Sequence, residues 1–163
     1  RLSVKELQKF KGIGEAKALS IVSALELGRR RKEADPLKKI KISSSFDAYE
    51  YLEADLVDHK HEEFWLILLK RSNEVIKKEM VSKGGVSGTV VDPKLIFKRA
   101  LEETASSIIV AHNHPSGSLS PSRQDMELTK RISDAGRSLE IAVLDHLIIV
   151  DRGYFSFADE SML

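Results

Sequence analysis

The sequence of 163 residues contains no cysteine. Disulfide bonds and thiolate metal sites are therefore excluded, and a metal ion would have to be held by histidine and carboxylate side chains. The sequence also lacks an apolar run of the roughly 20 residues that a membrane-spanning helix needs, and its first residues do not have the pattern of a signal peptide. We expect a cytoplasmic protein without membrane association. Because the chain does not begin with methionine, we also expect a segment before Arg1.

Negative charge is scarce at the amino end, although the net charge of the chain is only +1. Residues 1–42 contain 12 Lys or Arg and 5 Asp or Glu, whereas residues 43–163 contain 14 and 20. An acidic surface repels phosphate, so contact with nucleic acid is expected only of the amino-terminal part. The length suits one domain with a full core and a small appendage.

The most informative stretch runs from His112 to Asp125. The apolar segment before it, residues 107–111, is short and rich in β-branched residues, which predicts a buried strand. Because side chains two apart in a strand project to the same side, His112 and His114 are suited to bind one metal ion. Ser122, with Asp125 three positions later, predicts the capping box of a helix. From the first turn of that helix, the carboxylate of Asp125 can reach the two imidazoles.

Two histidines and one carboxylate are the protein ligands of a catalytic zinc site, which keeps a fourth position for water. A structural zinc site would need four protein ligands. The pattern His-x-His-Pro, six residues, then Ser-x-x-Asp resembles the signature of the JAMM (MPN-plus) metallopeptidases. The fuller run 112–117, followed by Pro121, resembles the bacterial RadC branch, and the resemblance extends over nearly the whole chain. It implies a Zn²⁺-dependent hydrolase that uses a metal-activated water to cleave a peptide or isopeptide-like amide bond in a peptide or protein substrate.

The resemblance also implies roles for residues outside the ligand set. In the family, a glutamate on an early strand is the general acid and base. Glu79, on a predicted hairpin, matches the family pattern better than Glu74 in the turn before it. The resemblance gives Ser122 a hydrogen bond to the developing oxyanion, beside its role as helix cap. His146, next to Asp145 in an apolar strand, is interpreted as a supporting or core residue rather than a ligand.

Residues 58–63 form a second cluster of histidines and carboxylates and are therefore a rival metal site. The cluster has no buried strand before it, no proline stop and no third ligand at a matching distance. We interpret it as a charged surface loop.

The amino-terminal residues resemble a helix-hairpin-helix element. A capping box predicts a helix over 3–10, and apolar spacing predicts another over 16–30. The turn between them contains Gly12 and Gly14, whose backbone N–H groups would bind a DNA phosphate without reading sequence. The cationic candidates for further phosphate contacts are Lys11, Arg29, Arg30 and Arg31. A plain helical hairpin followed by a solvated linker is the alternative interpretation.

Composition indicates a domain boundary near residue 36, which separates the helical element, residues 1–36, from a metallohydrolase domain, residues 37–163. Apolar periodicity predicts further helices over 46–57 and 122–135 and another starting at Asp92, and strands over 64–69, 75–81, 139–150 and 154–157. The expected fold class is α+β, with a mixed sheet flanked by helices as in JAMM and cytidine-deaminase-like proteins.

Two other functions stay open. The chain is either a DNA-associated, repair-linked protein whose residues 1–36 contact phosphates non-specifically, or a non-catalytic interaction module with a vestigial site. The substrate and the oligomeric state do not follow from the sequence.

Overall fold

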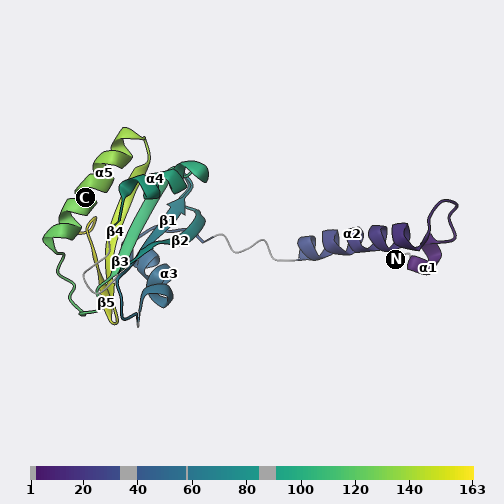
Figure 1. Cartoon of the computed structure of the whole chain (residues 1–163), viewed down its shortest axis with the longest axis horizontal. Helices are drawn as coiled ribbons and strands as arrows, with labels where there is room; N and C mark the ends of the chain where they lie inside the picture. The colour runs from purple at the N-terminus through teal and green to yellow at the C-terminus, as the bar shows by residue number, and fades with distance from the viewer. Residues whose placement is uncertain (1–2, 34–39, 58, 85–90) are drawn as a thin grey trace. The chain divides into compact units, whose positions relative to one another are not determined.

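The computed structural model describes residues 3–33, 40–57, 59–84 and 91–163, with side chains described except for residues 29–33. The chain divides into two units, Arg1–Lys39 and Ile40–Leu163 (Figure 1). Within the described residues, no helix combines the length and the apolar character that crossing a membrane requires.

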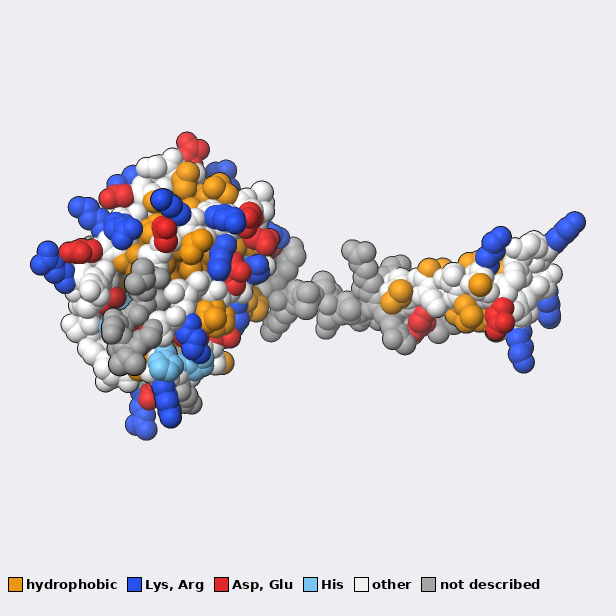
Figure 2. Space-filling view, viewed as in Figure 1, with side chains coloured by type: hydrophobic (Ala, Val, Ile, Leu, Met, Phe, Trp, Pro, Cys, Tyr) orange, Lys and Arg blue, Asp and Glu red, His pale blue; other side chains and the backbone are white. Residues whose placement is uncertain are grey.

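The smaller unit contains two helices, α1 (Val4–Leu7) and α2 (Glu15–Glu33). Ser3 caps α1 in the predicted capping box, but the helix ends at Leu7, three residues earlier than expected. Gly12, in the turn between the helices, has a φ of 86°, which explains a glycine there. Apolar side chains are visible on the surface of this unit in Figure 2, and Leu25 is 69% exposed.

The larger unit is built on a five-stranded sheet with the strand order β2-β1-β3-β4-β5 (Figure 1). The strands are β1 (Glu63–Leu69), β2 (Val75–Lys83), β3 (Ser107–Asn113), β4 (Ala142–Val150) and β5 (Gly153–Ser156). β3 and β4 are parallel, and the other neighbouring pairs are antiparallel. The predicted α+β class with a mixed sheet is confirmed.

Helices cover both faces of the sheet (Figure 1). One core contains buried residues of α4 (Pro93–Glu102) and α5 (Arg123–Ser138), together with Phe64 and Leu66 of β1. The other core contains buried residues of α3 (Ser45–Leu56), together with Ile67 and Leu69 of β1. β1 is therefore buried on both faces, which accounts for its continuous apolar sequence.

Several element boundaries differ from the sequence prediction. β3 continues past residue 111 to Asn113, so His112 lies within the strand. α5 does not stop at residue 135 but continues through Gly136 to Ser138. Any Cβ at Gly136 would lie 2.6 Å from the carbonyl oxygen of Ile141, so the glycine permits close packing of the helix on the chain that enters β4. The last long strand begins at residue 142 rather than 139.

The strand β4 contains a bulge. Ile108 pairs with Val143 and Ile109 pairs with Asp145, so Leu144 is the extra residue of β4. After the bulge, Val110 pairs with His146. The bulge therefore sets which β4 side chains face the ligand end of β3.

Candidate metal centre

The three predicted ligands are brought together by the end of β3 and the first turn of α5. His112 lies in β3, and the N–H of His114 donates to the carbonyl of Ile149 at 3.1 Å, which holds the chain beside β4 after β3 ends. The capping box at the start of α5 is present as predicted. The Asp125 N–H donates to Ser122 Oγ at 3.1 Å, and the Ser122 N–H donates to Asp125 Oδ2 at 2.7 Å. The cap thus orients the Asp125 carboxylate.

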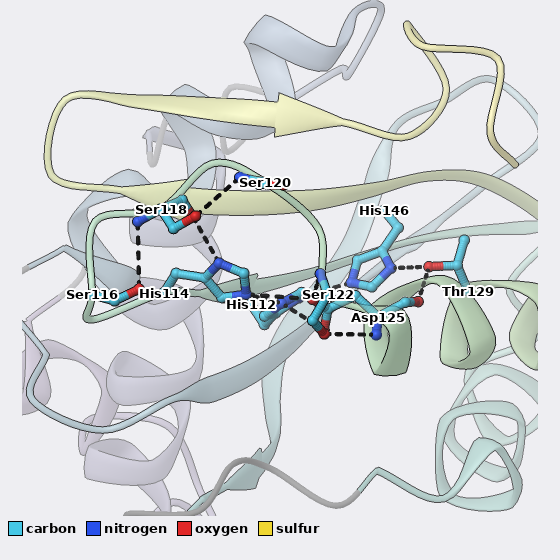
Figure 3. A network of polar contacts seen from close by, with 9 residues as sticks. All are labelled: His112, His114, Ser116, Ser118, Ser120, Ser122, Asp125, Thr129 and His146. Atoms are coloured by element: carbon cyan, nitrogen blue, oxygen red, sulfur yellow. Dashed lines mark hydrogen bonds and ion pairs between the residues drawn. The ribbon is translucent and has the colours of Figure 1, made fainter.

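The donor atoms of these residues converge on one point (Figure 3). His112 Nε2 lies 3.2 Å from Asp125 Oδ1, and His114 Nε2 lies 3.5 Å from Asp125 Oδ2. The two Nε2 atoms are 3.1 Å apart. One ligand atom from each residue falls within 4.8 Å of the others, and the side chains are 6%, 11% and 15% exposed. The group is therefore compact and only partly open to solvent.

The chemistry of this donor set fits a metal ion. His114 Nδ1 lies 2.7 Å from the carbonyl oxygen of Ser118. A carbonyl only accepts, so Nδ1 carries a hydrogen and Nε2 is left as the metal-binding nitrogen. Two Nε2 atoms and a carboxylate are all acceptors when the imidazoles are neutral, and acceptors this close need a proton or a cation between them. Three nitrogen and oxygen donors of this kind suit an open metal site.

Protons compete with a metal ion for the donor atoms of His112, His114 and Asp125. The hydrogen bond with Asp125 raises the pKa of His114, and the Ser118 carbonyl and the charges of Asp125 and Glu62 act in the same direction, while burial opposes them. Burial alone would raise the pKa of Asp125, but the hydrogen bonds with His112 and His114 hold it far below its usual range. Without a metal, His114 therefore keeps a proton to a higher pH than an ordinary histidine.

A further histidine, His146 of β4, contacts the ligand set through His112. Its Nε2 lies 2.9 Å from His112 Nδ1, and its Nδ1 lies 2.6 Å from the hydroxyl of Thr129 on α5 (Figure 3). His146 is fully buried, and burial lowers its pKa well below the ordinary value. Thr129 was not predicted from the sequence. The only local signal was its position one helical turn after Asp125, which places both residues on one face of α5.

Asp145 has a different role from its neighbour His146. Its carboxylate accepts hydrogen bonds from Ser156 Oγ at 2.7 Å, from the Ala158 N–H at 3.0 Å and from the His146 N–H at 2.7 Å. Burial raises the pKa of Asp145. The residue therefore ties the bulged strand β4 to the chain that follows β5.

The interpretation of residues 58–63 as a surface loop is wrong for Glu63, which begins β1 and is 3% exposed. Its carboxylate is paired with His59 Nδ1 at 2.9 Å, Lys83 Nζ at 2.8 Å and Trp65 Nε1 at 3.2 Å. The register of β1 against β3 explains the burial of Glu63. Phe64 pairs with His112, so the preceding residue, Glu63, also lies within the sheet. In the described part of this segment, residues 59–63, no group of three metal donors is found.

Asn113, between the two histidine ligands, fastens this segment to β3. Its Oδ1 accepts from the Glu63 N–H at 2.7 Å, and its Nδ2 donates to the His61 carbonyl at 3.1 Å. The amide thus holds the backbone on both sides of Glu62, whose charge contributes to the raised pKa of His114. In the sequence, Glu62 stands out only as a member of the rival site, residues 58–63. The missing signal was the long-range register of β1 against β3.

Glu79, the predicted acid and base, lies on β2 opposite Leu66. Its carboxylate lies 3.0 Å from Lys77 Nζ and 3.8 Å from Arg99 Nη1, and its Oε1 is buried without a hydrogen-bond partner. These contacts are with cations of β2 and α4. Glu74 precedes β2 and lies 3.1 Å from Lys70 Nζ. The role of either glutamate stays a prediction.

Of the predicted phosphate contacts, Lys11, Gly12 and Gly14 lie in the turn before α2. Neither glycine has an atom within 4 Å of an added Cβ. The side chains of Arg29, Arg30 and Arg31 lie outside those that the structure describes.

The mixed sheet, with a histidine pair at the end of β3 and an aspartate at the start of α5, defines a JAMM-like domain. Comparison with known proteins gives the family, because the model of the RadC-like JAB domain matches residues 42–162. The chain therefore belongs to the RadC family. Its similar relatives carry the name UPF0758 protein. One from Flavobacterium johnsoniae is 52% identical over 162 residues, which are 99% of this chain and 71% of the relative.

Relatives from other organisms are also similar to this chain. The UPF0758 protein of Porphyromonas gingivalis is 44% identical over 165 residues, covering 100% of this chain and 73% of its own length. That of Methanosarcina mazei is 40% identical over 161 residues, with 99% and 70% covered. Similarity at this level includes the amino-terminal unit as well as the JAB domain.

Proposed function

We propose that this chain is a JAMM-type zinc-dependent hydrolase that cleaves a peptide or isopeptide-like amide bond in a peptide or protein substrate. The observation that carries the proposal is the convergence of His112 Nε2, His114 Nε2 and the Asp125 carboxylate within 4.8 Å. Zinc is favoured because these are two imidazoles and one carboxylate with no thiolate, the ligand types of catalytic zinc hydrolases. Bound zinc would supply a nucleophile at neutral pH and polarise the amide carbonyl.

Glu62 is our candidate for the group that moves the proton, with Glu79 as the sequence-based alternative. Glu62 directly precedes β1 and lies two residues before Phe64, whose ring stacks on that of His112 with centroids 6.0 Å apart. The charge of Glu62 acts on His114. Two hydrogen bonds to Asn113 hold the backbone around it. A carboxylate whose charge is felt at a ligand is suited to take a proton from the nucleophile and deliver it to the leaving amine.

Ser122 is our candidate for the oxyanion donor. Its hydroxyl oxygen accepts from the Asp125 N–H, which leaves the O–H hydrogen to donate to a substrate oxygen. The side chain is exposed at the start of α5, beside the donor set.

The test measures zinc per chain and hydrolysis together. Zinc is determined by elemental analysis after dialysis against a weak chelator for the wild type, His114→Ala and Asp125→Ala. Asp134→Ala, which removes an exposed carboxylate from the same helix, is the matched control. We expect about one zinc in the wild type and in Asp134→Ala and little in the other two. A wild type that stays metal-free after refolding with zinc would overturn the proposal.

Hydrolysis is then assayed with the zinc-loaded protein on a panel of amide and isopeptide substrates. Glu62→Gln and Glu79→Gln are compared, because both keep the size of the side chain and remove its basicity. We expect Glu62→Gln to lose turnover by about 10²–10⁴-fold with zinc retained, and Glu79→Gln to stay close to wild type. The opposite result would return the role to Glu79.

We also propose non-specific contact of DNA by residues 1–36. The observation that favours it is Gly14, where φ is not positive and an added Cβ would meet no atom within 4 Å. Among the described residues of this unit, no packing contact requires a glycine at that position, whereas a ligand that approaches the backbone closely would. Neutralising Lys11 and Arg29 to Arg31 should reduce both the DNA affinity and its salt dependence. Unchanged binding would exclude this contact.

A further inference from the structure

We infer that Thr129 is a positioning residue that determines, through His146, which nitrogen of His112 is free to bind metal. The inference rests on the proposed function for its consequence, but the hydrogen-bond directions that it states exist without a metal. It starts from the polar network in Figure 3, which joins α5, β4 and β3.

The direction of the network is set at the hydroxyl of Thr129, a residue that is 2% exposed. Thr129 Oγ1 lies 2.6 Å from the carbonyl oxygen of Asp125 and 2.6 Å from His146 Nδ1. A threonine hydroxyl has one hydrogen, and a carbonyl oxygen can only accept. The hydrogen therefore points to the Asp125 carbonyl, so the hydroxyl must accept from His146. Nδ1 of His146 consequently carries a hydrogen.

His146 is neutral in these surroundings, so the hydrogen on its Nδ1 determines the role of its Nε2. The ring is fully buried, with the rings of Phe157 and Phe64 at centroid distances of 4.8 and 5.6 Å. The carboxylate of Asp145 is turned to Ser156 and to backbone N–H groups. A neutral imidazole has one N–H, so Nε2 of His146 is an acceptor. It accepts a hydrogen bond from His112 Nδ1, which lies 2.9 Å away.

The result for His112 is that Nδ1 is always the hydrogen-bearing nitrogen. Nε2 is then the nitrogen that faces Asp125 and His114, and it is the one that a metal ion would use. The series of hydrogen bonds starts at the backbone carbonyl of Asp125 and ends at His112, whose Nε2 lies 3.2 Å from the Asp125 carboxylate. Thr129 touches neither the ligand atoms nor a substrate, so its effect is on the orientation and hydrogen placement of His112.

The first test is made on the metal-free protein. Long-range ¹H–¹⁵N correlation spectra show which nitrogen of each imidazole carries the hydrogen. We expect His146 to carry it on Nδ1 in the wild type and in Thr129→Ser, which keeps the hydroxyl. In Thr129→Val, which has nearly the same shape without the hydroxyl, we expect it to move to Nε2. An unchanged Nδ1–H in Thr129→Val would overturn the inference whether or not the protein binds zinc.

The second test is zinc affinity, measured by competition with a chromophoric chelator. We expect Thr129→Val to bind zinc about 10–100-fold more weakly, as for other partners of metal-bound histidines, and Thr129→Ser to be close to wild type. Equal affinities of Thr129→Val and wild type would contradict the positioning role. A wild type that binds no zinc would instead contradict the proposed function, and the tautomer result would still decide the inference.

A second pair of variants covers the case in which Thr129→Val does not fold. His146→Gln keeps an oxygen that can accept from His112 Nδ1, whereas His146→Leu does not. We expect His146→Leu to lose zinc affinity by about 10–100-fold and His146→Gln to lose less. Wild-type affinity in a folded His146→Leu would refute the inference.

Discussion

Two clusters of histidines and carboxylates lie next to each other in the larger unit, and they differ in what their carboxylates bind. Glu63 is paired with Lys83, His59 and the indole N–H of Trp65, so each contact brings a hydrogen to the carboxylate. The carboxylate of Asp125 faces two Nε2 atoms that are acceptors when neutral. A metal site is therefore distinguished by acceptor atoms that share no hydrogen, and not by the residue types that it contains.

Acidification is expected to have the largest effect on the difference between the Glu63 and Asp125 clusters. Zinc must displace the proton that His114 holds, and the pKa of His114 is raised above its ordinary 6.5. Below that raised pKa, zinc affinity should fall by about tenfold for each pH unit per displaced proton. Competition with a chelator at several pH values measures the slope. A flat profile across the range would mean that His114 does not bind the metal.

The metal-free protein should respond to pH in the opposite sense. The raised pKa of His114 contributes stability that is fully present below pH 6.5 and is lost as the pH rises through the folded-state pKa. The lowered pKa of His146 costs stability below pH 6.5, because only the unfolded state takes up that proton. The free energy of unfolding without zinc should therefore rise as the pH falls towards 6.5. Urea denaturation with and without zinc compares the two slopes, and Asp125→Asn should remove the rise.

Removal of the other carboxylate is expected to change stability and not metal binding. Glu63→Ala leaves the indole N–H of Trp65 without its acceptor, and this should lower the free energy of unfolding by about 1–3 kcal/mol. Zinc content should stay at the wild-type level. Urea denaturation measures the free energy of unfolding, and elemental analysis measures the zinc content. Loss of zinc with the fold intact would show that the two clusters are coupled.

The smallest effect is expected from His61→Ala. The side chain is exposed, and the contact of this residue with Asn113 is made by its backbone carbonyl. Stability should change by less than about 0.5 kcal/mol, and zinc content should not change. A loss of zinc here would mean that the His-x-His of residues 59–61 takes part in metal binding after all.

Local rules were sufficient for the ligands. The alternation of a strand brought His112 and His114 to one side, and a capping box put Asp125 in the first turn of α5; both depend on neighbours in sequence. The residues that surround the ligands depend on long-range register. Asn113 bonds to the backbone of His61 and Glu63 because Phe64 pairs with His112, and Thr129 meets His146 because α5 packs on β4. No local pattern contains that information.

Gly136 shows the same limit for the fold. Glycine usually marks the end of a helix, and this was the basis of the predicted end of α5. Here it lies inside the helix, because the carbonyl of Ile141 comes too close for any side chain. Local conformation and tertiary packing both select glycine, and only the structure separates the two causes.

The carboxylate of Asp125 both caps α5 and faces the two imidazoles, and this links the start of the helix to the site. Oδ2 accepts from the Ser122 N–H to begin the helix and also faces His114, while Oδ1 faces His112. An ion that draws on the carboxylate must weaken or redirect the hydrogen bond that begins α5. Occupancy of the site should thus be readable in the amide signals of residues 122 and 125, without any substrate, as a change in how firmly the helix starts.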